Sequence, residues 1–472
     1  MIARGAILFC GALLSGALGA RVAPAYADEN NDLDLIPHAI EENAPSPAAG
    51  ASAASHGKYY VEDAFGITSR RGGLVVPQPP PPPANWRNRT SLDATDQWHL
   101  ANDLTLAFSD RFNLREENDY DFPSRQIVRN DFREGYLTWQ PIAQDYLEAG
   151  RINLRNGVAL GFNPTDFFKT RTAVDQSSLD PSTVREDRLG TAMLRGEGIW
   201  NGAAASIAYA PKFYAPTRVV PGSQPGISPM LDRTNAAHRV LLSASYDIAD
   251  LSPQALLYHE SDETRLGLNL SHPIGQSIVA YAEWAGGRQR NLIEEAISYG
   301  KKTGTLPQTA PVIPPTDTSK SFRQDFALGG SWTSAEKITV NLEYHYHQAG
   351  FSGSDLRRWF AIGGAQARVP NVTSELWYIR GYANDQQEPL ARQQVFLRAD
   401  WNDAIVPDLE LAALTFVNLY DGSTLSQLSA NYYLSSAWTI SGYINANLGR
   451  PRSERGSFAQ AGSAILQLTR YF

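Results

Sequence analysis

Three side chains with metal-binding chemistry occupy alternate positions of one segment: Glu343, His345 and His347. In an extended strand such positions share a face about 7 Å apart, and imidazole and carboxylate groups are common zinc ligands. A metal site is therefore one interpretation. A strand with one face toward water produces the same pattern without metal, and we favour that interpretation. We expect neither a metal site nor a bound cofactor.

A nucleophile for hydrolysis is the second chemistry that the residue types allow. Ser243 or Ser245, with His259 on a neighbouring segment, is the nearest combination, and it would need an orienting partner. No glycine elbow marks a nucleophile, and no Walker loop or dinucleotide fingerprint is present. We expect that the chain is not an enzyme, and we keep a hydrolase as an alternative.

Charged residues recur on the polar side of segments whose other side is apolar. Arginine and carboxylate residues share these faces, as in Arg195 with Glu197. Rings of fixed charge select ions in channels, but mixed charges also neutralise one another and stiffen a polar interior; both interpretations stay open. The candidate pore-lining residues are Arg195, Glu197, Arg239, Asp247, Arg265, Glu283, Arg323, Asp325, Glu343, His345, His347, Arg392, Arg398 and Asp400.

Extended strands are the elements that must position these residues. Residues 338–347 alternate between apolar and polar side chains without exception, and residues 239–247 do so with Leu241 as the one exception. The segments are about ten residues long, which matches a tilted membrane-crossing strand better than a strand of a soluble sheet. The pattern predicts an all-β fold, a transmembrane antiparallel β-barrel.

The connections between these segments alternate in length. Short links such as 201–202 and 334–337 alternate with long stretches such as 156–188, 213–237 and 290–320. Short periplasmic turns and long extracellular loops are the expected asymmetry of an outer-membrane barrel. Amphipathic indole rings close to the short turns indicate an interfacial girdle, and they belong to Trp98, Trp139, Trp200, Trp332, Trp401 and Trp438.

The strand count supports this scheme. From residue 89 onward we find 17 strands, but an even number is needed if both ends of the barrel are periplasmic. Residues 59–70 supply the missing strand and make the proline-rich stretch 71–88 the first outer loop. We expect 18 strands, with 16 as the alternative. The terminal Phe472 resembles the signal by which such barrels contact their assembly machinery.

The N-terminal region predicts export. Residues 1–27 have the basic start, apolar stretch and small-residue cleavage site of a signal peptide. Residues 28–57 are too poor in large apolar side chains to fold and predict a flexible periplasmic segment, so the barrel comprises residues 58–472. The only cysteine, Cys10, lies in the signal peptide, which argues against disulfides and Cys-ligated metal.

Charge and hydropathy exclude two classes of protein. The 472 residues include 41 basic and 49 acidic side chains, so a nucleic-acid binder, which needs a basic field, is not expected. Beyond the N-terminus no stretch approaches the roughly 18 consecutive apolar residues of a spanning helix, which excludes a helical membrane bundle.

Residues 132–213 contain a set of short motifs: Arg133-Glu134-Gly135-Tyr136-Leu137, Ala149-Gly150-Arg151-Ile152-Asn153 with Asn156-Gly157, Asn163-Pro164-Thr165-Asp166, Arg188-Leu189-Gly190 and Met193-Leu194-Arg195-Gly196-Glu197. With these motifs the chain resembles a large family of poorly characterised Gram-negative outer-membrane barrels, related more distantly to the eighteen-stranded alginate-export porins. The sequence departs from the family where Arg155 and Asn156, and no tryptophan, precede Gly157. The resemblance implies transport across the outer membrane without assigning a substrate.

These observations predict an outer-membrane, porin-like channel for passive passage of small polar or anionic solutes, surrounded by outer-membrane lipids. One alternative is a dedicated duct that exports an alginate-like polysaccharide or takes up an apolar compound. Alternatives from another class are an outer-membrane hydrolase and a plugged, surface-binding barrel. Alanine at both Arg323 and Arg398 is expected to shift ion selectivity toward cations.

Two long loops are candidates to narrow the pore. Residues 213–237 are proline-rich and irregular, and residues 354–361 could start a short helix capped by Ser354, with Leu356, Trp359 and Phe360 as an apolar patch. Each loop could fold inward or lie over the outer surface, and the sequence does not separate these arrangements.

Overall fold

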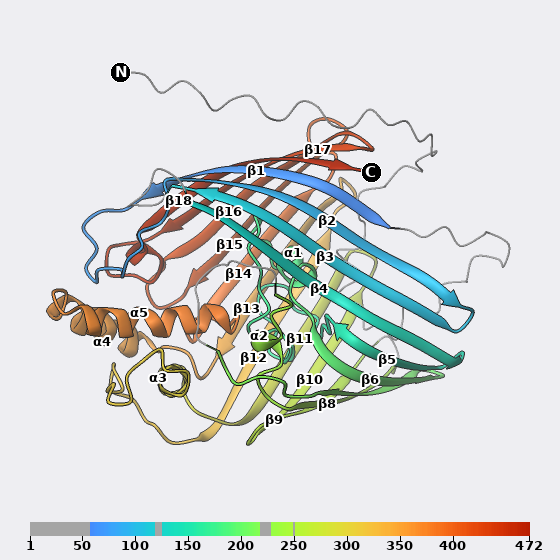
Figure 1. Cartoon of the computed structure of the whole chain (residues 1–472), viewed down its shortest axis with the longest axis horizontal. Helices are drawn as coiled ribbons and strands as arrows, with labels where there is room; N and C mark the ends of the chain where they lie inside the picture. Colours follow the sequence, from blue (N-terminus) through green and yellow to red (C-terminus); the bar gives the residue numbers. More distant parts are fainter. Residues whose placement is uncertain (1–56, 119–124, 218–227, 249–250) are drawn as a thin grey trace.

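The computed structural model describes residues 57–118, 125–217, 228–248 and 251–472. The predicted signal peptide and nearly all of the predicted flexible segment 28–57 lie outside these ranges. The described strands form one closed antiparallel sheet of 18 strands, because β1 pairs with both β2 and β18 (Figure 1). The strands are β1 (Lys58–Arg70), β2 (Trp86–Ala101), β3 (Leu104–Glu117), β4 (Arg125–Ile142), β5 (Asp145–Ile152), β6 (Thr191–Trp200), β7 (Ala203–Ala210), β8 (Arg239–Tyr246), β9 (Gln254–Glu260), β10 (Glu263–Ile274), β11 (Ile278–Gln289), β12 (Ser321–Thr333), β13 (Ile338–His347), β14 (Gln393–Trp401), β15 (Leu409–Asn418), β16 (Thr424–Ser435), β17 (Trp438–Leu448) and β18 (Gln460–Tyr471).

The predicted barrel and its count of 18 strands are confirmed, and the alternative of 16 is wrong. Each of the 18 predicted segments corresponds to one observed strand, with ends that differ by a few residues. Residues 58–70 form the first strand, so the proline-rich stretch after it connects β1 to β2. We call the two ends of the barrel the short-turn end and the long-loop end.

The helices lie in the longer connections. None of the described helices is long and apolar enough to cross a membrane. They are α1 (Pro181–Glu186), α2 (Leu231–Thr234), α3 (Leu292–Lys302), α4 (Gly353–Ala365), α5 (Pro370–Asp385) and a 3-10 turn (Arg455–Ser457).

The predicted short helix at 354–361 exists as α4, but its predicted cap is wrong. The helix begins at Gly353, and its N-cap is Ser352, two residues before the predicted cap: the Ser352 hydroxyl accepts from the backbone N–H of Asp355 at 3.2 Å. The Asp355 carboxylate in turn accepts from the backbone N–H of Ser352 at 3.0 Å, which completes a capping box. Ser354 lies inside the first turn, where its backbone is already helical.

The outer face of the barrel is apolar. Leucines such as Leu342 on β13, Leu428 on β16 and Leu466 on β18 point outward, the last with 63% of its surface exposed. An apolar surface that surrounds the whole molecule is unfavourable in water and suits lipid. Of the six tryptophans predicted to form a girdle, Trp98, Trp139, Trp200, Trp332 and Trp401 are exposed on this face.

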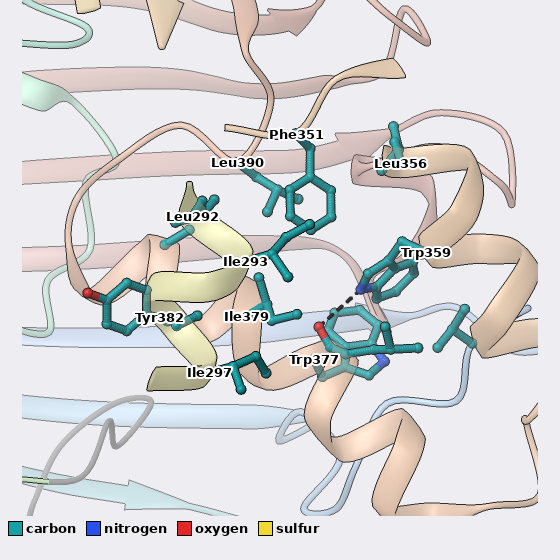
Figure 2. Packing of buried hydrophobic residues seen from close by; sticks show 14 of the residues in the cluster. Leu292, Ile293, Ile297, Phe351, Leu356, Trp359, Trp377, Ile379, Tyr382 and Leu390 are labelled. Carbon is teal, nitrogen blue, oxygen red and sulfur yellow. Dashed lines mark hydrogen bonds between the residues drawn. The ribbon is translucent and has the colours of Figure 1, made fainter. Parts of the chain in front are cut away.

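A helical cap, made of α3, α4 and α5, lies at the long-loop end (Figure 1). Its core centres on Trp359, which is fully buried and donates its indole N–H to the carbonyl oxygen of Leu376 at 3.0 Å (Figure 2). Ile293 of α3 and Ile379 of α5 pack in the same cluster. The connections 290–320 and 351–388 therefore fold together into one structure with its own apolar core, which also buries the predicted patch Leu356, Trp359 and Phe360.

Candidate functional site

The inner segment, residues 153–190 between β5 and β6, crosses the inside of the barrel. One part of it reaches β3, where Arg115 donates to Asp175 at 2.6 Å. Another part reaches β11, where Glu283 accepts from the backbone N–H of Val158 at 2.5 Å. Since β3 and β11 lie on opposite sides of the eighteen-strand ring, the segment spans the lumen. Residues 156–188 are thus a long connection between β5 and β6 at the long-loop end, as predicted, but they fold into the lumen.

Glu283 of β11 holds the start of the crossing. Its buried carboxylate accepts from the backbone N–H groups of Val158 at 2.5 Å and Ala159 at 2.6 Å, and from the Thr165 hydroxyl at 3.0 Å. Gly157 has a φ of +94°, and a Cβ there would lie 2.5 Å from Glu283 Oε1. The carboxylate and the chain thus approach so closely that only glycine fits.

Glu343 of β13 holds the next two residues. It accepts from the backbone N–H groups of Leu160 at 2.6 Å and Gly161 at 2.9 Å, and from the Tyr281 hydroxyl at 2.7 Å. Backbone N–H groups inside a barrel need acceptors, and two wall carboxylates supply them for residues 158–161. The inner segment is therefore held by its backbone, without regular secondary structure of its own in this stretch.

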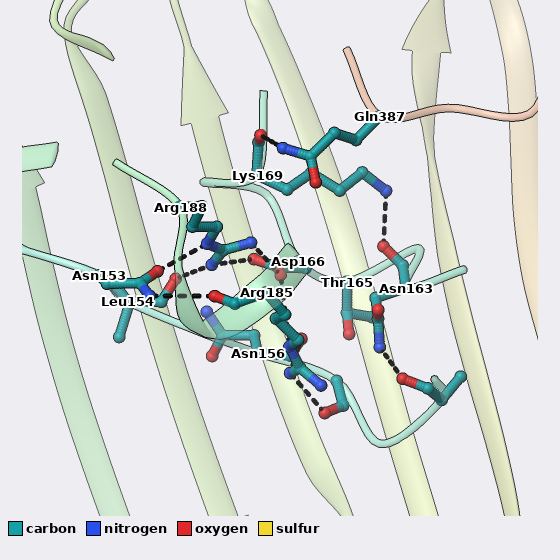
Figure 3. Close-up of polar contacts among 12 residues, drawn as sticks. Asn153, Leu154, Asn156, Asn163, Thr165, Asp166, Lys169, Arg185, Arg188 and Gln387 are labelled. Carbon is teal, nitrogen blue, oxygen red and sulfur yellow. Dashed lines mark hydrogen bonds and ion pairs between the residues drawn. The ribbon is translucent and has the colours of Figure 1, made fainter. Parts of the chain in front are cut away.

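Arg188 joins the two ends of the inner segment (Figure 3). Its guanidinium makes a bidentate ion pair with Asp166 at 2.6 and 3.1 Å. It also donates to the Asn153 side chain at 2.6 Å and to the carbonyl oxygen of Leu154 at 2.6 Å. Asn153 and Asp166 lie within the motifs described above, and Leu154 follows one of them. These motifs therefore supply the contacts that hold the two ends of the inner segment together.

The residues of the candidate metal site are engaged by protein partners. Glu343 contacts His345 Nε2 at 2.5 Å, and His347 Nδ1 contacts Asp325 at 2.9 Å. His347 Nε2 faces Glu388 at 3.5 Å. In the described part of the chain, no group of three His, Cys, Asp or Glu residues is arranged to hold a metal ion.

The candidate hydrolase residues lie on opposite faces of the barrel wall. Ser243 points inward, where its hydroxyl lies 2.7 Å from that of Ser206. His259 pairs in register with Val240, shares its outward face and is exposed. The barrel wall therefore separates His259 from both predicted serines.

The candidate pore-lining residues lie on the inner side of the barrel wall and at its ends, and they fall into two groups by exposure. Arg195, Glu197, Arg265, Arg323 and Arg392 are half-buried, and Asp247 is exposed just after β8. The others are covered by the inner segment, the cap or neighbouring side chains. The covered residues are Arg239, Glu283, Asp325, Glu343, His345, His347, Arg398 and Asp400. The position of both groups on a permeation path stays a prediction.

Arg398 changes the expectation for ion selectivity. Its guanidinium pairs with Asp180 of the inner segment at 2.8 Å and with Asp400 at 2.9 Å. Two carboxylates on one buried guanidinium leave no net positive charge for a passing ion. The expected shift toward cations therefore depends on Arg323.

A dense arginine cluster on β2, β3 and β4 was not among the sequence candidates. Arg111 and Arg133 share the carboxylate of Asp93, at 2.7 and 2.6 Å, and Arg133 also pairs with Asp187 at 2.6 Å. The i, i+2 spacing of Arg111, Asn113 and Arg115, and of Arg129, Asp131 and Arg133, was the available signal. The cluster binds the inner segment to this wall, and its members are Arg89, Arg111, Arg115, Arg129 and Arg133.

The contact of Asp175 with this cluster predicts a dependence on pH. Burial raises the pKa of Asp175, but the charges of Arg87, Arg89 and Arg115 outweigh burial and lower the pKa to about 2. An unfolded aspartate titrates near pH 3.9, so the stabilisation by Asp175 is complete above about pH 4 and is lost as the pH falls toward 2.

Urea unfolding followed by tryptophan fluorescence, for the wild type and Asp175→Asn, tests this expectation. The wild type is expected to be more stable at pH 5, with a difference that shrinks as the pH falls to about 2. A difference in free energy of unfolding that stays constant over this range would contradict it.

A polar cavity of about 240 Å³ remains between the inner segment, β8–β10 and the cap. Charges of both signs line it, including Lys169, Arg265 and Glu295. Burial raises the pKa of Glu295 to about 7, although Arg265 opposes this shift. Such a cavity can hold small polar molecules by charge and hydrogen bonds, and its net charge becomes more negative as the pH rises through 7.

Comparisons with known proteins show only distant likenesses. No family model and no curated protein matches the chain. The chain is similar to the structure of Pseudomonas aeruginosa OccK11 (OpdR), with 11% identity, a TM-score of 0.46 and coverage of 89% of this chain and 96% of that chain. A triple mutant of Rhodopseudomonas blastica porin has 10% identity and a TM-score of 0.37, with coverage of 89% and 100%. The assignment of this chain as a closed eighteen-strand barrel comes from its own strand pairing.

Proposed function

We propose that the protein is an outer-membrane, porin-like channel for passive passage of small solutes. The observation that carries this proposal is a closed barrel of 18 strands with an apolar outer face, a polar inner face and a chain segment held across the lumen. Barrels of 16 to 18 strands are too wide for side chains to fill, so water enters them. The inner segment narrows that lumen and sets a size limit on the solute.

Charge on the inner face favours polar solutes over apolar ones. The cavity beside the inner segment combines basic and acidic side chains, which suits a path for polar solutes. We infer non-enzymatic passage, driven by the gradient of the solute. Export of a polysaccharide, uptake of an apolar compound and the relation to alginate-export porins stay predictions.

A protein of the outer membrane must be exported and then inserted into that membrane. We propose that residues 1–27 direct export and that Phe472 contacts the barrel-assembly machinery. The Phe472 backbone N–H donates to the carbonyl oxygen of Tyr59 at 3.0 Å, whereas its ring is exposed beside β1. An exposed aromatic ring at the end of the last strand is available to a partner protein.

Planar-bilayer recording of purified, refolded protein tests the channel. We expect stable open conductance, and liposome swelling that falls steeply as the size of a neutral sugar increases. A silent barrel would overturn the proposal and favour a plugged, surface-binding barrel. Passage of long oligosaccharides without a size limit would favour the polysaccharide duct.

A further inference from the structure

Two arginines that form no ion pair with a carboxylate of the described residues share a pocket at the long-loop end of the barrel. Arg323 lies near the start of β12 and Arg392 immediately before β14, and both line a pocket of about 280 Å³. Arg323 donates through Nε to the carbonyl oxygen of Gln289 at 3.3 Å, and Arg392 donates to that of Gly350 at 3.5 Å. Arg392 Nε is buried without a hydrogen-bond partner among the described residues.

The two guanidinium groups carry like charges into one pocket, and the nearby Asp317 carboxylate offsets part of the charge of Arg323. The two acidic side chains of the pocket are engaged elsewhere: Asp317 accepts from the hydroxyl and backbone N–H of Ser319, both at 2.9 Å, and Asp355 belongs to the capping box of α4. Neither carboxylate forms an ion pair with Arg323 or Arg392. This differs from Arg398, Arg188 and Arg133, whose charges are all paired.

The start of α3 also faces the pocket. Asn291, the N-cap of α3, lines the pocket, whereas the start of α4 is already capped by the Asp355 carboxylate. The N-terminus of a helix carries a partial positive charge, so the start of α3 beside two arginines favours an anion. Ile293 also lines the pocket and is anchored in the core of the cap, which holds the start of α3 in place (Figure 2).

We propose that Arg323 and Arg392 form a binding site for a small oxyanion, a carboxylate or a phosphate, at the long-loop end of the lumen. Guanidinium groups match the planar fork of a carboxylate and the oxygens of a phosphate, and a bridging anion relieves the repulsion between them. The site rests on the proposed function in that it concentrates anionic solutes at the entrance of the channel.

Titration calorimetry of the full-length protein in detergent tests the site without a need for conductance. Succinate and inorganic phosphate, in separate titrations, distinguish the two classes of oxyanion. Arg323→Gln/Arg392→Gln is expected to weaken binding by at least about tenfold, since it removes both charged hydrogen-bond donors of the site. Arg70→Gln/Arg288→Gln, which removes two exposed arginines outside the pocket, is expected to bind like the wild type.

Equal affinity in the pocket variant and the wild type, or binding of neither probe to the wild type, would overturn the proposal. Bilayer recording of the wild type and of both double variants separates failure of the anion site from failure of the proposed channel. An open channel without arginine-dependent binding retains the proposed function and rejects the site. Arginine-dependent binding to a silent barrel retains the site and rejects the channel.

Discussion

With Glu283 and Glu343 both replaced by glutamine, the inner segment is expected to leave the barrel wall, and the single-channel conductance is expected to rise several-fold. The two carboxylates accept the backbone N–H groups of residues 158–161. An amide loses the negative charge and turns an N–H group toward those donors. Hydrogen bonds to a charged acceptor contribute about 1.5–3 kcal/mol each, so the loss exceeds what the segment can replace locally.

Glu410→Gln is the matched control for this experiment. Glu410 lies on β15 and accepts from the Tyr433 hydroxyl at 2.9 Å and from the Asn431 side chain at 3.3 Å, away from the inner segment. Its variant is expected to conduct like the wild type. Each single glutamine variant should show a smaller increase, which guards against misfolding of the double variant. Unchanged conductance of a correctly folded double variant would show that the inner segment is not the constriction.

Arg188→Ala is expected to lower the free energy of unfolding by about 3–5 kcal/mol, the range for a buried pair that loses one partner. The Arg188 side chain is buried, and its removal leaves the Asp166 carboxylate, Asn153 and the carbonyl oxygen of Leu154 without their donor. Lysine is not expected to restore the loss, because an ammonium group cannot make the bidentate contact. Urea unfolding in detergent measures the effect.

Asp166→Asn in the Arg188→Ala background removes a buried carboxylate whose remaining cation, Arg185, lies 3.7 Å away, and is expected to recover part of the stability. The exposed ion pair of Lys337 with Asp403, at 2.5 Å, is the matched control. Lys337→Ala should change stability by no more than about 1 kcal/mol, since solvent screens an exposed pair. Equal losses from Arg188→Ala and Lys337→Ala would argue against a structural role for the buried pair.

Much of the barrel could be predicted from local pattern. Alternation of apolar and polar residues placed all 18 strands, since each strand presents one face to lipid and the other to the lumen. Leu241, the apolar exception on the polar face of its strand, indicated where the lumen is filled. It is buried against Phe167 and Phe168 of the inner segment, so an apolar residue on the inner face marked a place where the lumen is filled.

Local pattern could not place the inner segment, because the groups that hold it are distant in the sequence. Glu283 follows Val158 by 125 residues and Arg398 follows Asp180 by 218, and neither pair has a sequence spacing that predicts contact. Helices α3 and α5 were not predicted either, although α3 has Asn291 as its N-cap and acidic side chains in its first turn. Packing around Trp359 stabilises both helices.

Residue type and strand parity were thus sufficient to specify the barrel, its two faces and the inward direction of most charged side chains. Which charges remain available was decided only when the chain closed on itself. Arg398 and Arg323 are equivalent as sequence candidates, but the inner segment brings Asp180 to the first and no carboxylate to the second. The charge that a solute meets depends on which groups pair across the lumen, and this pairing is a property of the closed barrel and its inner segment together.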